Sequence, residues 1–136
     1  MENPLFALLI HDRPHPFEAL KEALKALAVR TFSVRTCEEL DRLISQTQPH
    51  LIFSDTSFTD GTWMDVVRSA EEAPVPVNVI LVGANDNMKL YVSALERGAF
   101  DFILPPFERQ GLEFVVTSAA RDASRRRQFQ ALVGAA

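Results

Sequence analysis

The sequence has very little cysteine and no apolar run long enough to cross a bilayer. Cys37 is the only cysteine among the 136 residues, so the chain cannot form an internal disulfide. This favours a reducing compartment, and we expect a cytoplasmic protein. The apolar run at residues 5–10 is too short to span a membrane, and no basic segment of the kind that opens a secretory signal precedes it. These absences argue against export and against membrane insertion.

Glycine is also scarce, and the charge is not biased toward the positive. The 5 glycines form no cluster after any strand-like segment, which weighs against a glycine-rich loop that cradles the phosphates of a nucleotide. The formal net charge is −4 and the pI is about 5.3, so we expect no direct contact with nucleic acid. The basic cluster at residues 121–127 is interpreted as a solvated or salt-bridged helix face.

The sequence does contain five apolar segments of strand length, which alternate with five helical segments. The composition, with 47% apolar and 24% charged residues, is that of a globular domain. The alternation predicts a single doubly wound (βα)5 domain of α/β class, with a five-stranded parallel sheet covered by helices on both faces, as in flavodoxin-like folds. Strands are predicted near residues 5–10, 29–34, 51–55, 77–82 and 100–104, and helices near 16–28, 37–48, 62–72, 86–97 and 108–130.

Short local patterns place the ends and the faces of these helices. Thr36 followed by Glu39 predicts a capping box at the start of the second helix. Asn85 or Asp86 is expected to cap the fourth helix, and Gly98 suits the left-handed residue that ends it. The spacing within the third helix predicts a buried stripe made of Met64, Val67 and Ala70.

Two aspartates stand directly after apolar strand segments. Asp12 follows the first segment after His11, and Asp55 ends the third. In a doubly wound sheet, two neighbouring central strands bring such residues to the same carboxyl edge. Two carboxylates together with backbone carbonyls are ligands that Mg²⁺ prefers. The spacing is equally consistent with aspartates that only cap a turn or a helix.

These segments, in this order, resemble a response-regulator receiver domain of the chemotaxis-regulator type over nearly the whole chain. The resemblance is carried by LIHD at 9–12, PHLIFSD at 49–55, FTDGT at 58–62, GAFDF at 98–102 and PF at 106–107. It implies a non-enzymatic module of a two-component phosphorelay, in which Asp55 accepts a phosphoryl group from a sensor histidine kinase. The resemblance further implies that Asp12, Asp55 and Ser57 hold Mg²⁺ and that Phe102 is an aromatic residue that switches rotamer.

The chain departs from the family pattern at positions that make or sense the phosphoryl group. His11 stands where the family has the first acid of a pair, Gly83 where a hydroxyl follows the fourth strand, and Pro105 where a lysine precedes the last proline. A neutral imidazole is a poor Mg²⁺ ligand, and neither glycine nor proline offers a side-chain donor. The resemblance therefore implies a pseudo-receiver, with Mg²⁺ binding and phosphorylation weak or absent. Arg13 or Lys89 could supply a cation to Asp55, although each is more often a solvated charge.

Other interpretations stay open at this point. The chain could be a competent Mg-dependent phospho-receiver that uses non-standard residues, or a flavodoxin-like enzyme that binds a phosphate or nucleotide. His11, His15 and His50 are scattered and predict no metal centre. The peptide bond between Pro105 and Pro106 is predicted to be cis.

The last residues of the sequence predict a connection to another domain or to a second copy of the chain. Residues 1–120 are predicted to form the receiver-like domain, and residues 121–136 an extension of the last helix. This extension suits a linker to an output domain or a contact between two copies of the chain. Through the resemblance, the face formed by the fourth helix, the fifth strand and the fifth helix is the expected partner surface.

Overall fold

The computed structural model describes residues 5–134, and within them the predicted α/β architecture is confirmed. Five parallel strands form one sheet in the order β2-β1-β3-β6-β7. The expectation of no signal segment, which rested on the first residues, and the outermost residues of the predicted domain ranges lie outside the described part. The elements are β1 (Phe6–Ile10), α1 (Phe17–Ala26), β2 (Arg30–Val34), α2 (Cys37–Thr47), β3 (Leu51–Asp55), β4 (Ser57–Phe58), β5 (Gly61–Thr62), α3 (Trp63–Glu71), β6 (Asn78–Val82), α4 (Met88–Arg97), β7 (Asp101–Ile103) and α5 (Arg109–Gly134).

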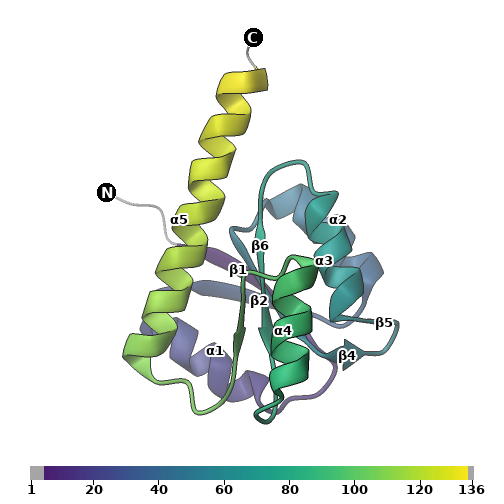
Figure 1. The fold of residues 1–136 in the computed structure, drawn as a ribbon, viewed down its shortest axis with the longest axis vertical. Coiled ribbons are helices and arrows are strands. Elements are labelled where there is room, and N and C mark those ends of the chain that lie inside the picture. Colours follow the sequence, from purple (N-terminus) through teal and green to yellow (C-terminus); the bar gives the residue numbers. More distant parts are fainter. Residues whose placement is uncertain (1–4, 135–136) are drawn as a thin grey trace.

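Helices cover both faces of the sheet, with α1 and α5 on one face and α2, α3 and α4 on the other (Figure 1). Strand β1 shows why its sequence has no polar face. Ala7 and Leu9 pack under α1 and α5, whereas Leu8 and Ile10 pack under α2, α3 and α4. Because a strand buried on both sides needs apolar residues at every position, it is a continuous apolar run in the sequence.

The cap of α2 is only half of the predicted capping box. The N–H of Glu39 donates to the hydroxyl of Thr36 at 3.2 Å, as predicted. The carboxylate of Glu39, however, accepts the N–H of Arg35 at 3.3 Å. The reciprocal bond is therefore made one residue earlier than a capping box requires.

The cap of α4 lies later than predicted. Asn87, and not Asn85 or Asp86, accepts the N–H of Leu90 at 3.1 Å. Three consecutive residues with suitable side chains leave the first turn undetermined by sequence. Gly98 ends the helix with φ of 109°, so its predicted left-handed role is confirmed.

The buried face of α3 is turned relative to the prediction. Trp63, Val66 and Val67 are buried, whereas Met64 is 39% exposed and Ala70 is half-buried. The reason is that Trp63, the first residue of the helix, takes a core position, and residues three and four later then share its face.

The segment between β3 and α3, predicted as a turn, contains a small hairpin. β4 pairs with β5 in antiparallel register, with Ser57 opposite Thr62 and Phe58 opposite Gly61. The carboxylate of Asp60 at the tip accepts the N–H of Cys37 at 3.0 Å, which ties the hairpin to the start of α2. This hairpin stands beside the end of β3 and therefore shapes the surroundings of Asp55.

Helix α5 is the longest element, and its C-terminal part rises above the rest of the structure (Figure 1). A buried amide holds it to the sheet, because Asn78 donates to the carbonyl of Ala119 at 2.8 Å and to Asp122 at 3.0 Å. Arg127 donates to the carbonyl of Pro76 at 2.8 Å. The helix therefore contacts the body as far as Arg127. The predicted boundary at residue 120 stays a prediction.

The basic cluster on α5 is largely paired within the protein. Asp122 forms ion pairs with Arg125 at 3.0 Å and with Arg126 at 2.9 Å. These contacts agree with the interpretation of a salt-bridged helix face. In residues 5–134 no helix combines the length and the apolar character that crossing a membrane would require.

Candidate functional site

Asp55 lies at the carboxyl end of β3, in the middle of the sheet. It is 3% exposed, and one of its carboxylate oxygens accepts the N–H of Thr56 at 2.7 Å. Asp12 follows β1, which pairs directly with β3. The prediction that the two aspartates share one edge of the sheet is therefore confirmed. The two carboxylates nevertheless have different partners.

The carboxylate of Asp55 is held by the guanidinium of Arg13. The Nη2 atom of Arg13 donates to both oxygens, at 3.1 and 3.2 Å. The side chain of Asp55 is 4% exposed and that of Arg13 is 59% exposed. A buried carboxylate requires a compensating positive charge or several donors. Here the protein supplies that charge from its own β1–α1 loop.

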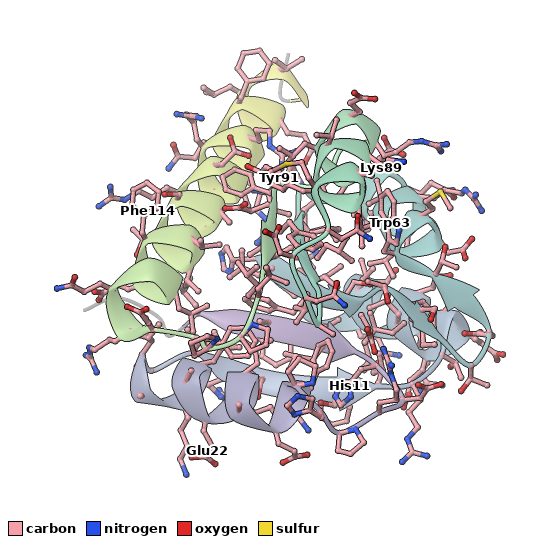
Figure 2. The ribbon with its side chains drawn as sticks, turned by 60° about the horizontal axis from the view of Figure 1, so that its bottom comes forward. His11, Glu22, Trp63, Lys89, Tyr91 and Phe114 are labelled. Carbon is pink, nitrogen blue, oxygen red and sulfur yellow. The ribbon has the colours of Figure 1, made fainter. Side chains whose placement is uncertain are left out.

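His11 fixes the backbone of the residue that pairs with Asp55. His11 is 7% exposed, and its ring stacks on Phe17 with the centroids 4.2 Å apart. Its Nδ1 atom lies 2.6 Å from the carbonyl oxygen of Arg13, and because a carbonyl can only accept, Nδ1 carries the proton. Nε2 then accepts the hydroxyl of Ser33 at 3.2 Å. Burial is the main reason that the pKa of His11 lies below its ordinary value, which agrees with a neutral ring. In Figure 2, His11 is labelled beside α1.

Asp12 turns toward the β4–β5 hairpin. Its carboxylate accepts the hydroxyl of Thr59 at 2.8 Å. Ser57, implied as a third metal contact, is an exposed residue of β4. Within residues 5–134 no three His, Cys, Asp or Glu side chains are arranged to hold a metal ion. With Asp55 paired to Arg13 and no second acid at position 11, the donor set fits Mg²⁺ poorly.

Gly83 lies under the ring of Phe102. A Cβ atom at Gly83 would stand 2.6 Å from Cζ of Phe102 and 3.0 Å from Cδ2 of Leu104. The ring of Phe102 is half-buried and lies 5.9 Å from the ring of Tyr91, at an angle of 58°. The missing side chain at Gly83 therefore makes room for the phenyl ring. Whether Phe102 switches rotamer stays a prediction.

Pro105 follows β7 at the carboxyl edge of the sheet and carries no charge. Its peptide bond to Pro106 is cis, as predicted. Lys89, considered as an alternative cation for Asp55, is exposed on α4. In Figure 2 Lys89 lies in the upper part of the view, whereas His11 lies in the lower part. Of the two cations proposed from the sequence, Arg13 is the one that reaches Asp55.

Ser33 and Thr59 were not among the residues predicted from the sequence. The pairing of β1 with β2 aligns Leu9 with Ser33, so knowledge of this register would have placed a hydroxyl beside His11. No such pattern points to Thr59, because its contact with Asp12 depends on the unpredicted hairpin.

The structure is an α/β domain with a buried acid at the end of its central strand, and comparison with known proteins identifies its family. The family model for the response regulator receiver domain matches residues 7–117. The chain therefore belongs to the response-regulator receiver-domain family, whose members are non-enzymatic modules of two-component signalling. The alternative prediction of a flavodoxin-like enzyme is wrong.

Curated relatives include longer regulators. The chain is 28% identical to the response regulator protein PilR of Pseudomonas aeruginosa over 115 residues, which are 85% of this chain and 26% of PilR. It is 27% identical to the transcriptional regulatory protein CitB of Klebsiella pneumoniae over 131 residues, covering 94% of this chain and 56% of CitB. The chain thus spans about a quarter of PilR.

Solved structures share the fold. NtrX from Brucella abortus superposes with a TM-score of 0.80 at 22% identity, covering 96% of this chain and 29% of NtrX. The beryllofluoride-activated NtrC4 receiver domain dimer gives a TM-score of 0.75 at 19% identity, covering 87% of this chain and 98% of that one. At these identities the likeness establishes the fold alone.

Proposed function

We propose that this receiver domain is a pseudo-receiver, in which phosphorylation of Asp55 is weak or absent and signalling proceeds through protein–protein contacts. The observation that carries the proposal is the ion pair between Arg13 and Asp55. One nitrogen of the guanidinium lies 3.1 and 3.2 Å from the two carboxylate oxygens. The acid that would attack a phosphoryl donor is thus already bound on both oxygens.

The chemistry of phosphoryl transfer explains why this arrangement disfavours reaction. Transfer to a carboxylate depends on positioning and on cations that neutralise the charge on the phosphoryl oxygens. In this chain Pro105 supplies no amine, Gly83 supplies no hydroxyl, and His11 supplies no second acid. Arg13 remains, but its charge is used to compensate Asp55.

We propose that Mg²⁺ binds weakly or not at all. The residues offered by the resemblance are Asp12, Asp55 and Ser57. A hard cation here would have to displace Arg13 from Asp55 and Thr59 from Asp12, and would then find two carboxylates. The cost of breaking both contacts opposes binding.

For partners, we propose contacts through the face formed by α4, β7 and α5. Met88 is 63% exposed and Val92 is 46% exposed on α4, and Phe114 is 73% exposed on α5. Figure 2 shows Phe114 directed outward. A sensor kinase, an output domain joined through an extension at residues 121–136, and a second copy of the chain are the proposed partners. The greater length of PilR and CitB supports the output domain, and the NtrC4 receiver dimer supports the second copy.

The proposal is tested by treating the protein with acetyl phosphate and Mg²⁺ and measuring its intact mass. We expect no stoichiometric gain of a phosphoryl group in the unaltered chain, and likewise no gain in Asp55→Asn. Beryllofluoride with Mg²⁺ should likewise leave the fluorescence of Trp63, the only tryptophan, unchanged. Full modification that disappears in Asp55→Asn would refute the proposal and favour the alternative, a competent phospho-receiver with non-standard residues.

A further inference from the structure

A cavity of about 310 Å³ lies beside the Arg13–Asp55 pair, between the end of β1, the first turns of α1 and the end of β2. Asp55 does not line this cavity, so the cavity is a separate feature from the Asp55 site. His11 and Ser33 stand on its sheet side, and Arg13, Lys21 and Arg35 reach it from three separate segments of the chain. Three basic side chains around one hollow are notable in a chain whose net charge is −4.

We propose that this cavity binds a compact oxyanion with two negative charges, either inorganic phosphate or the phosphate monoester of a small metabolite. Binding would draw the guanidinium of Arg13 away from Asp55. The proposal rests on the pseudo-receiver function, because it supplies the input that phosphorylation would otherwise provide. The ligand would therefore control whether the buried carboxylate of Asp55 is compensated.

The basic side chains around the cavity have N–H donors that are available to bind a ligand. The Nη2 atom of Arg13 makes both contacts to Asp55, and its Nε and Nη1 atoms make no hydrogen bond within residues 5–134. In the same described range, the guanidinium of Arg35 has neither an ion pair nor a hydrogen bond. Lys21 has one ion pair, to Glu18 at 3.8 Å, and Glu18 is 71% exposed. Such an exposed, long pair is weak and yields readily to a doubly charged ligand.

The acids that line the cavity are already engaged. Asp12 accepts the hydroxyl of Thr59 at 2.8 Å, and Glu18 faces Lys21. These two carboxylates reduce the positive potential of the cavity, but they do not occupy its volume. A guanidinium binds phosphate oxygens through parallel N–H donors, whereas the contact to Asp55 uses one nitrogen. A phosphate group can therefore offer Arg13 a better geometry than Asp55 does.

The backbone beside the cavity is suited to a movement of the Arg13 side chain alone. His11 holds the carbonyl of Arg13 at 2.6 Å, so the loop stays in place. The Arg13 side chain is 59% exposed and can turn without leaving a core position. The cavity volume is near the lower limit of small-molecule sites, about 300 Å³, which favours a compact ligand over a nucleotide.

The test is a titration of the whole chain with inorganic phosphate in a phosphate-free buffer, at constant ionic strength maintained with chloride, followed by amide NMR. We expect saturable shifts at Arg13, Ser33 and Arg35, and at Thr56, whose N–H binds Asp55. Lys21→Ala and Arg35→Ala should each weaken binding about tenfold. Lys25→Ala, on the same helix but away from the cavity, is the matched control and should bind normally.

A second titration, with glycerol phosphate, distinguishes the two sources of the ligand. Tighter binding of the monoester assigns the site to a phosphorylated metabolite, and tighter binding of phosphate assigns it to the free ion. Asp55→Asn should bind phosphate more tightly, because Arg13 is then released from its carboxylate partner. Absence of saturable shifts, or equal weakening by Lys25→Ala, would overturn the site. Unchanged affinity in Asp55→Asn would overturn the link to Asp55. Both titration results are independent of the acetyl phosphate experiment, which tests the pseudo-receiver function on its own.

Discussion

Replacing Arg13 by alanine would leave the buried carboxylate of Asp55 without its cation. Asp55 would keep the N–H of Thr56 at 2.7 Å as a donor. Breaking a fully buried ion pair costs about 3–5 kcal/mol, whereas an exposed pair contributes about 0.2–1 kcal/mol. The Asp55 side chain is 4% exposed but that of Arg13 is 59% exposed, so water can enter the vacated space. We therefore expect Arg13→Ala to lower the free energy of unfolding by about 1–2 kcal/mol.

Urea unfolding followed by far-ultraviolet circular dichroism measures this loss. For a urea slope of about 1–3 kcal/mol per molar, the midpoint should fall by roughly 0.3–2 M. Asp55→Asn and the double variant complete a mutant cycle, whose coupling free energy should be about 1 kcal/mol. Arg30→Ala, an exposed arginine on the edge strand β2, is the control and should change stability by less than about 0.5 kcal/mol.

Two results would contradict this reasoning. If Arg13→Ala unfolds at the same urea concentration as the unaltered chain, the guanidinium contributes nothing to the buried carboxylate. If the effects of Arg13→Ala and Asp55→Asn simply add, the two side chains are energetically independent in spite of their contact. Either outcome would contradict the view that the Arg13–Asp55 ion pair stabilises Asp55, and the proposed function depends on that view.

Three further predictions concern other parts of the molecule. Gly83→Ala should destabilise the fold by about 1–3 kcal/mol in urea unfolding, because its Cβ would lie 2.6 Å from the ring of Phe102, and Phe102→Leu should relieve part of that loss. Burial, together with Asp60, raises the pKa of Cys37 to about 11, so iodoacetamide at pH 8 should alkylate it at least roughly tenfold more slowly than a free cysteine peptide; a comparable rate would refute this. Hydrogen bonds from Asn78 and Arg126 lower the pKa of Asp122 below 3.8, so its contribution to stability is present above that pH and is lost as the pH falls through the lowered value. Unfolding of Asp122→Asn should therefore depend less on pH in this acidic range, and an unchanged dependence would contradict the assignment.

The fold could be predicted from the sequence because its three central strands, β1, β3 and β6, are buried on both faces. Leu8 and Leu9 pack on opposite sides of the sheet, so the run around them is uniformly apolar and easily recognised. Helix caps were harder, since Asn85 and Asp86 have the same capping ability as Asn87. Asn78 shows a signal that was available: an amide within an apolar strand has to find partners, which here are on α5.

The site was predictable in position and less so in its contacts. The alternation of strands and helices predicts a parallel sheet, and the strand order in the structure places β1 beside β3, so that Asp12 and Asp55 lie at one edge. Sequence spacing does not determine where a long side chain points, so Arg13 was only one of two candidate cations. The contact between Asp12 and Thr59 requires the β4–β5 hairpin, whose two-residue strands are too short to leave a periodic pattern.

Under the proposed function, the departures from the family pattern support one another. His11 replaces an acid, and its ring fixes the carbonyl of Arg13. Arg13 then supplies the positive charge that a buried Asp55 needs without Mg²⁺ or lysine. Because His11 removes one acid from this edge of the sheet, less positive charge is needed to balance the remaining carboxylates. A proline can therefore replace the lysine of the family pattern at position 105. The pair of Arg13 and Asp55 is therefore expected to depend on His11, so that His11→Ala should weaken the coupling measured between them.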